Sequence, residues 1–595
     1  ENNGSGLEGN FKLVYKPIEG LAITSRLGYK IYNEKGRTFT PIQNYGISKV
    51  YNIPQSSVYQ FKATSTRVVF ETFANYSKTF AEDHNTTFTL GTSVQNDLFD
   101  GIYASGINVP NNSYDFAQLN LTDPQNEQRS LNSGFADKRL TSFFGRIQYD
   151  YQGKYLFSGL IRRDGSSAFI KEFRFDQFWA LTTGWKISEE NFLKDNETIS
   201  FLKLRASYGT LGNEVGNNLY RSLLNGEGTY VFDGALVDGT AQGGLPNPLA
   251  QWETAEKLDI GLDINLFDDK VSIVADYFEE SRKDLLIANF PVSGILGTSA
   301  PGGGRPTVNA GTSLNTGAEL AISYAAIKTE DASLNFAYNV TYVKNEVTDV
   351  TGGAFIEGGG FAIGNLPPSR MEVGQPIGYF YGLQTDGLFQ NQAAIDAHPS
   401  QAALGASATS PGDIRYKDVN GDGIIDINDR TNIGKPQADF YMGFNFSGTY
   451  KNWDFSAYLY SELGKEIVRN YERFLPNVNK PSYYLGRWTG EGTSNSIPRL
   501  TNDATNNKLF SDFFVEDGSF LRLQNVQIGY NINADTLERI GVSKLRVYTS
   551  VNNLFTITDY SGYDPTINGG AIGAGIDYGT YPSARQFILG LNVEF

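Results

Sequence analysis

Residues 257–278 constrain the fold of this chain most, because their polarity alternates with a period of two on both sides of a tight turn. Leu and Ile occupy the even positions from 258 to 266, and Lys, Asp, Gly and Asn occupy the odd positions from 257 to 265. After Phe267-Asp268-Asp269 the chain returns with Val, Ile, Ala and Tyr at odd positions from 271 to 277. One aliphatic and one charged face predict a β-hairpin between an apolar and an aqueous environment.

Similar hairpins recur along the chain, and no segment is predicted to form a core that would cover their apolar faces. A transmembrane antiparallel β-barrel satisfies this pattern, because it has lipid outside, water inside and no free edge. The 35 Tyr, 40 Phe and 5 Trp suit the aromatic girdles of such a barrel. The sequence has no run of about 18 apolar residues, which a transmembrane helix requires. We therefore predict an all-β protein whose residues 1–595 form one transmembrane barrel.

The alternation predicts about 17 strands, each long enough to cross a bilayer at a tilt. They are expected near residues 7–16, 20–33, 66–82, 85–97, 138–152, 154–167, 176–187, 200–212, 254–266, 269–283, 313–327, 332–345, 438–450, 453–463, 518–532, 543–557 and 584–595.

Short turns such as Gln152–Gly153 alternate with long loops, which are Gly- and Asn-rich and show no compact hydrophobic pattern. The loops are expected near 34–65, 98–137, 213–253, 284–312, 346–437, 464–517 and 558–583. In outer-membrane barrels the short turns face the periplasm and the long loops face outside. A soluble β-propeller is the alternative, but it needs a fixed period of about 40 to 50 residues, which the chain lacks.

Composition argues against several classes of function. The chain has no Cys, which removes disulfides, thiol nucleophiles and Cys-based metal centres. Its net charge of −16 argues against nucleic acid as a partner. His84 is expected in a turn and His398 in a loop, and they suggest no catalytic arrangement. We do not expect an enzyme.

Short motifs are spread along nearly the whole chain. They include Arg162-Arg163-Asp164-Gly165-Ser166-Ser167, Leu202-Lys203-Leu204-Arg205, Trp252-Glu253-Thr254, Asn315-Thr316-Gly317, Gly374-Gln375-Pro376-Ile377, Thr385-Asp386-Gly387-Leu388-Phe389-Gln390, Gly412-Asp413-Ile414-Arg415, Arg487-Trp488-Thr489, Ile497-Pro498-Arg499, Phe520-Leu521-Arg522 and Tyr563-Asp564-Pro565. In content and order they resemble the SusC/RagA-type TonB-dependent transporters of the Bacteroidota outer membrane.

The resemblance implies a barrel of about 22 strands with a plug in its lumen, which suits a barrel of this size. It also implies a SusD-like surface lipoprotein as a lid and TonB as the source of energy. About five strands, the plug and the TonB box would then lie N-terminal to Glu1, and TonB would act through that part. We interpret the chain as the C-terminal barrel portion of a longer protein, with its loops facing outside and outer-membrane lipid around it.

The function that the resemblance implies is import of a bulky nutrient, an oligosaccharide or a peptide. A second interpretation is a structural scaffold or accessory subunit of another outer-membrane complex. An open porin is disfavoured, because the lumen is plugged in the family that the chain resembles.

Residues 418–429 match the pattern of a calcium loop. Side-chain oxygens stand at positions 1, 3, 5, 9 and 12 of that pattern, which are Asp418, Asn420, Asp422, Asp426 and Asp429. Gly423 at position 6 permits the sharp turn, and Ile424 at position 7 contributes its backbone carbonyl. We predict a structural Ca²⁺ that stiffens this loop. The alternative is a solvated turn rich in Asn, Asp and Gly.

Two further features have a functional and a structural interpretation. Tyr379, Phe380, Tyr381 and Trp488 lie in two long loops and could contact substrate, or they could simply pack within the loops. Phe595 ends the last predicted strand, and its resemblance to the C-terminal residue of outer-membrane proteins implies a barrel-assembly signal. The structural interpretation is simply a last strand, and both interpretations can hold at once.

Overall fold

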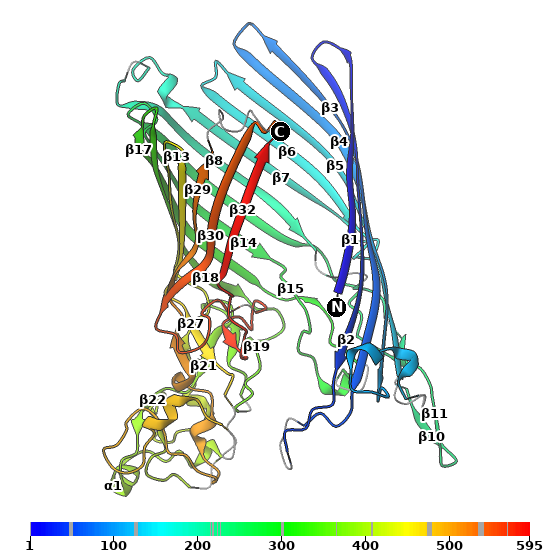
Figure 1. Ribbon diagram of the computed structural model, residues 1–595, viewed down its shortest axis with the longest axis vertical. Helices are drawn as coiled ribbons and strands as arrows, with labels where there is room; N and C mark the ends of the chain where they lie inside the picture. The colour runs from blue at the N-terminus through cyan, green and yellow to red at the C-terminus, as the bar shows by residue number, and fades with distance from the viewer. Residues whose placement is uncertain are drawn as a thin grey trace. The chain divides into compact units, whose positions relative to one another are not determined.

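A computed structural model shows an all-β chain whose main element is an antiparallel sheet of 17 strands. It describes residues 2–46, 52–123, 129–194, 196–214, 216, 219–222, 224–226, 228–298, 303–364, 366–405, 408–472, 479–532, 541–567 and 569–594. Each predicted strand overlaps one strand of the sheet (Figure 1). They are β1 Asn2–Ile18, β2 Leu21–Thr40, β3 Ser57–Phe80, β4 His84–Ile107, β5 Arg129–Tyr151, β6 Tyr155–Ser166, β7 Phe175–Lys186, β8 Ile199–Asn213, β13 Glu253–Leu266, β14 Val271–Lys283, β17 Thr312–Lys328, β18 Ala332–Asp349, β25 Phe440–Tyr450, β26 Trp453–Leu463, β29 Phe520–Asn531, β30 Lys544–Thr558 and β32 Gln586–Glu594.

The remaining strands are short and lie in the connections. They are β9 Leu224–Asn225, β10 Tyr230–Phe232, β11 Ala235–Val237, β12 Ala241–Gln242, β15 Leu286–Ile287, β16 Val308–Asn309, β19 Phe355–Gly358, β20 Ser369–Glu372, β21 Tyr379–Gly382, β22 Thr385–Leu388, β23 Ile414–Tyr416, β24 Thr431–Gly434, β27 Glu466–Arg469, β28 Val515–Asp517 and β31 Ile576–Asp577. A single α-helix, α1 (Gln392–Asp396), occurs in the described part of the chain. None of the described helices has the length and apolar character needed to cross a membrane.

The chain divides into two compact units. The first contains residues 1–183, 207–255 and 286–309, and the second contains 184–206, 256–285 and 310–595. In the first unit, β1 to β6 pair in sequence order. In the second unit, β14, β17, β18, β25, β26, β29, β30 and β32 do the same.

Strands β3 and β4 have 24 residues and β5 has 23, so they are longer than the sequence predicts. Thr64 pairs with Asp100, and Ser133 pairs with Ile102, in these extensions. Their polar side chains fall on the face that carries Phe70 and Leu90 further along, so the alternation disappears although the backbone ladder continues. The predicted loops 34–65 and 98–137 shorten accordingly to 41–56 and 108–128.

The predicted short turns are confirmed, and left-handed backbone closes them. Gln152 and Gly153 have φ of 55° and 68°, and Phe267, Asp268 and Asp269 have φ between 54° and 62°. Positive φ at consecutive residues gives the turn the twist of the strands that it joins. Three- and four-residue connections of this kind, 152–154 and 267–270, bring sequence neighbours into register.

The polar face of the second unit carries a compact ion network. The Arg205 guanidinium on β8 lies 3.0 Å from Asp259, 3.2 Å from Asp263 and 2.5 Å from Asp276. Gly261 stands between the two β13 aspartates, and a Cβ atom there would lie 2.4 Å from the guanidinium carbon. The Asp-x-Gly-x-Asp spacing therefore leaves room for one arginine between two carboxylates.

We expect Arg205→Leu to destabilise the barrel by about 2 kcal/mol, because three carboxylates lose their shared counter-charge. Urea unfolding in detergent measures this change. Lys30→Gln is the control, because Lys30 and Glu8 are exposed and 3.5 Å apart, so its effect should stay within about 0.5 kcal/mol. Equal effects of the two substitutions would contradict the role of the network.

Candidate functional site

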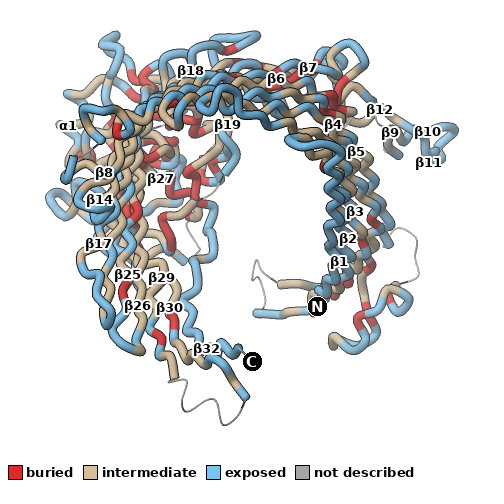
Figure 2. Tube along the Cα trace, turned by 90° about the horizontal axis from the view of Figure 1, so that it is seen from above, coloured by how far each residue is buried: buried red, intermediate tan, exposed pale blue. Residues whose placement is uncertain are grey.

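The long loops of the second unit contain packed hydrophobic cores. One cluster contains Phe361, Ile363, Phe380, Val468, Phe510, Phe514 and Ile576. Another contains Leu383, Leu388, Ile414, Tyr416 and Ile425. Buried segments are visible around β19 and β27 in Figure 2. The prediction that these loops lack a compact hydrophobic pattern is wrong, because residues that are far apart in the sequence pack together: the first cluster draws on three loops, and the second gathers residues from 383 to 425 of one loop. We call residues 355–437, 464–517 and 559–585 the loop assembly.

The predicted substrate-contacting aromatics of β21 lie inside the loop assembly. Tyr379 is 2% exposed and Phe380 is fully buried. The Tyr379 hydroxyl donates a hydrogen bond to the Glu372 carboxylate. Burial raises the pKa of this phenol, and Glu372 raises it further. Tyr379 and Phe380 therefore pack within the loops, which was the alternative interpretation, and they present no face to a solute in this structure.

Tyr381 and Trp488 have different surroundings. Two guanidinium groups lie over the Tyr381 ring, with Arg370 at 3.6 Å and Arg430 at 4.6 Å from its centroid. Burial lowers the pKa of Arg430, and Arg370 lowers it further. Trp488 packs against the other hydrophobic cluster and donates from Nε1 to Gln390 at 3.3 Å. Both rings are half-buried, and substrate contact by either remains a prediction.

The predicted calcium loop is held by hydrogen bonds from its own backbone. Asp418 accepts from the N–H groups of Gly421 and Gly423 at 2.7 and 2.8 Å. Asn420 accepts from Asp422, and Asp422 accepts from Ile424, both at 2.9 Å. Gly421 and Gly423 have φ of 76° and 84°, a conformation that glycine adopts without strain.

Asp429 closes this loop from its far end and is fully buried. Its carboxylate accepts from the N–H groups of Val419, Asn420 and Asp426. Asp426 accepts from Asn428 and caps the 3-10 turn Ile427–Asp429. Among the described residues, no three His, Cys, Asp or Glu side chains are grouped so as to hold a metal ion. A carboxylate has about four acceptor positions, so these hydrogen bonds leave acceptor positions for a cation.

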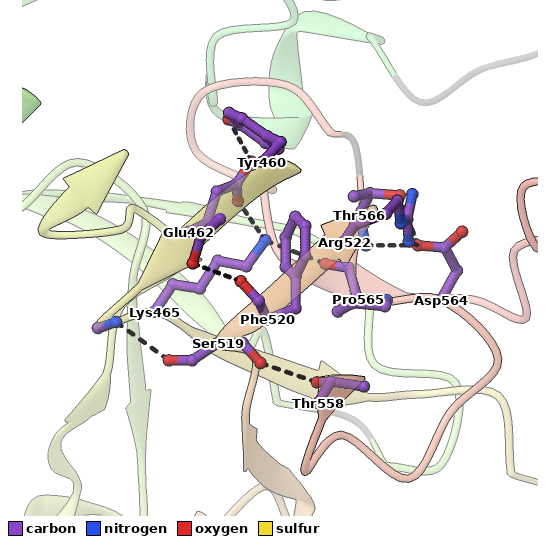
Figure 3. Close-up of polar contacts among 12 residues, drawn as sticks. Tyr460, Glu462, Lys465, Ser519, Phe520, Arg522, Thr558, Asp564, Pro565 and Thr566 are labelled. Carbon is purple, nitrogen blue, oxygen red and sulfur yellow. Dashed lines mark hydrogen bonds and ion pairs between the residues drawn. The ribbon is translucent and has the colours of Figure 1, made fainter. Parts of the chain in front are cut away.

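Figure 3 shows how the segment after β30 is fixed to the sheet. Arg522 on β29 donates from Nη2 to Asp564 at 2.6 Å, and both residues are at most 6% exposed. Lys465 donates to Glu462 at 2.5 Å and to the Pro565 carbonyl at 3.0 Å. Burial by itself would raise the pKa of Asp564. The hydrogen bonds from Thr566, Ser583 and Arg522 outweigh burial and hold this pKa below its ordinary range.

A second buried arginine lies within the loop assembly. Arg469 at the end of β27 pairs with Glu472 and lies 2.5 Å from Glu516. Its guanidinium also lies 4.6 Å from the Tyr483 ring centroid and 5.3 Å from that of Phe513. Two carboxylates and two rings thus surround one cation, which joins the end of β27 to Tyr483 and to the segment 513–516.

A cavity of about 490 Å³ lies between the strands and the loop assembly of the second unit. Its lining includes Arg282, Asn345 and Tyr441 from the strands and Ile377 and Ala571 from the loops. Asn345 donates to Ser313 and Asn315 at 2.9 and 2.7 Å and accepts from the Ile377 N–H at 2.7 Å. This one amide therefore joins the strand wall to the loop that closes the cavity.

Sequence reasoning missed Asn345, Lys465, Arg469 and the Arg522–Asp564 pair as positioning residues. Arg522 and Asp564 both belong to motifs that carry the family resemblance, so the motifs were a signal for them. Their pairing joins positions 42 residues apart, which no local pattern reveals. Phe595, the predicted barrel-assembly signal, lies outside the described residues.

The chain belongs to the family described as TonB dependent receptor-like, beta-barrel, which matches residues 2–460. Membership implies a barrel of the outer membrane, and the family is one of transporters and not of enzymes. Together with the SusC and RagAB matches described next, it confirms the SusC/RagA resemblance.

Individual relatives agree with this assignment. The TonB-dependent receptor P3 of Formosa agariphila is 31% identical, over 100% of this chain and 58% of that protein. The TonB-dependent receptor SusC of Bacteroides thetaiotaomicron is 31% identical, over 77% of this chain and 44% of that protein. The structure of the RagAB peptide transporter matches the fold with a TM-score of 0.81 and 22% identity, over 100% of this chain and 62% of that chain. The chain thus spans less than two thirds of the length of these relatives.

We expect Asp564→Asn to release the segment after β30, with a loss of about 3 kcal/mol, because Arg522 would stay buried without its counter-charge. The folded pKa of Asp564 is lowered. The stabilisation is therefore full above about pH 4 and is lost as pH falls through the folded value. Limited proteolysis at pH 7, and tyrosine fluorescence of the unsubstituted protein from pH 7 to pH 2, measure the two effects. Asp503→Asn is the control, because Asp503 is 78% exposed. Unchanged proteolysis of Asp564→Asn would contradict the role of the Arg522–Asp564 pair in fixing this segment to the sheet.

Proposed function

We propose that this chain forms the barrel of an outer-membrane, TonB-dependent importer of a bulky nutrient. Family membership carries this proposal, and the relatives named TonB-dependent receptors support the energy source. The RagAB structure is that of a peptide transporter, which keeps peptides beside oligosaccharides as candidate cargo.

A SusD-like surface lipoprotein would cover the loops 98–137, 346–437 and 464–517, and a plug would fill the lumen. An empty barrel of about 22 strands would leak solutes, so an importer needs both elements. TonB would act through a segment outside this chain.

Conductance and co-purification test the proposal on the full-length protein. We expect a current near zero in a planar bilayer and one stoichiometric lipoprotein after mild extraction. Large steady currents would indicate an open porin. A large complex with several barrels would favour the scaffold.

The orientation of the loops is part of the proposal. The chain has no Cys, so Ala408→Cys, Asp503→Cys and Glu330→Cys each introduce a single thiol. All three positions are exposed. An impermeant maleimide should label the first two variants on intact cells, and Glu330→Cys only after the outer membrane is opened. The reverse pattern would overturn the direction of transport.

We also propose that residues 418–429 bind one structural Ca²⁺ through Asp418, Asn420, Asp422, Asp426, Asp429 and the Ile424 carbonyl. The left-handed Gly423 and the closure by Asp429 support this proposal. The cation would neutralise carboxylates that otherwise repel one another.

Calorimetric titration should give a Kd of roughly 10⁻⁴ to 10⁻³ M. Asp422→Ala should abolish this binding and leave the barrel folded, because the paired strands do not depend on the loop. Asp396→Ala is the matched control, since Asp396 is an exposed carboxylate of the same loop assembly. Unchanged Ca²⁺ binding by Asp422→Ala, or no Ca²⁺ binding by the unsubstituted protein, would refute the site.

A further inference from the structure

The first unit has a cavity of about 690 Å³ that the import proposal does not use. Thr141 of β5, Gly165 of β6 and Phe175 of β7 line it, together with arginines from β5 and from two loops. Phe143 and Ile147 share the Thr141 face of β5 further along the strand, and they are 53% and 36% exposed. The cavity therefore opens on the apolar face of the sheet, which faces lipid in a barrel.

The level of the cavity across the membrane follows from the register of the β5–β6 hairpin. Tyr151 pairs with Tyr155 beside the short turn, and Thr141 pairs with Gly165 at the other end of the same hairpin. About ten residues separate the two pairs along each strand, which is the length that a tilted strand needs to cross the hydrocarbon layer. Tyr151 and Tyr155 thus suit one interface, and the cavity lies at the headgroup level of the opposite leaflet.

Three arginines line this cavity: Arg139, Arg174 and Arg221. Asp137 neutralises Arg139 through bonds of 3.1 and 2.7 Å. Arg174 and Arg221 form no ion pair within the described part of the chain, and the buried Arg174 Nε–H has no hydrogen-bond partner there. The cavity therefore holds two uncompensated positive charges.

The backbone that carries Arg174 is rigidly held. Its carbonyl accepts from the Ser166 N–H at 3.0 Å and from Trp252 Nε1 at 3.1 Å. Trp252 is 6% exposed and packs against Phe169 and Phe178. The guanidinium is thus presented from a fixed loop, as a preformed binding site requires.

We propose that this cavity binds a phosphate group carried by an outer-leaflet lipid, with Arg174 and Arg221 as its ligands. Guanidinium groups match phosphate in charge and geometry. Phe135 is 73% exposed and lies with Phe175 at the cavity, so apolar surface is available for the acyl chains of the same lipid. The inference rests on the outer-membrane location in the proposed function.

Native mass spectrometry of the full-length protein in a phosphate-free detergent tests this site. The probes are bis-phosphorylated lipid A, the same lipid after dephosphorylation, and glucose 6-phosphate as a soluble phosphate. We expect the phosphorylated lipid to bind about tenfold or more tightly than either other probe, and the double variant Arg174→Gln/Arg221→Gln to lose about that factor. Lys171→Gln, an exposed cation of the same loop outside the cavity, should bind like the unsubstituted protein.

Equal binding by the double variant, or by the dephosphorylated lipid, would overturn the site. Glucose 6-phosphate binding as tightly as the lipid would overturn the lipid as the source of phosphate. The double variant should keep the low conductance and the lipoprotein partner. Failure of lipid binding with those two properties intact would therefore refute this inference alone.

Discussion

The pairing of backbone N–H and C=O groups between neighbouring strands is the constraint on which the rest of this structure depends. In hydrocarbon an unpaired backbone group costs several kcal/mol, so each strand has to pair along its length. Turns as short as Gln152–Gly153 meet that demand with sequence neighbours. The side chains of the paired strands then point to one of two faces of the sheet, an apolar face or a polar face. Partners, cargo and ions therefore contact the polar face, the loops or the margins of the apolar face.

The loop assembly shows how irregular segments become fixed without regular structure of their own. Arg499 donates to Asp413 at 2.7 Å, and Asn507 donates to the same carboxylate at 3.0 Å. Arg415 donates to Asp386 at 2.7 Å. Each contact joins residues that are 29 to 94 positions apart in the sequence. Asp413 is 3% exposed, and a buried ion pair costs much to break. Its contacts with Arg499 and Asn507 therefore fix two of the three loops against each other.

The sequence predicts what depends on neighbours and misses what depends on distant partners. The Leu and Ile alternation of 258–266 identified a strand because side-chain direction repeats every two residues. The oxygen spacing of 418–429 is equally local. Phe380 was a candidate for substrate contact, yet its burial depends on Phe510 and Ile576 in other loops. Arg205 likewise gains its role from carboxylates on two later strands, and no spacing rule connects it with them.

The packing of the loop assembly bears on how an importer of this kind would open. Arg469 and Arg430 are buried among rings and carboxylates. Moving either one would expose apolar surface and separate charge pairs at the same time. Loops held in this way are poor gates, because opening them would break several coupled interactions. Access to a lumen would then be controlled by parts that dock against the loops or fill the lumen, which is the task that the proposed lid and plug would perform.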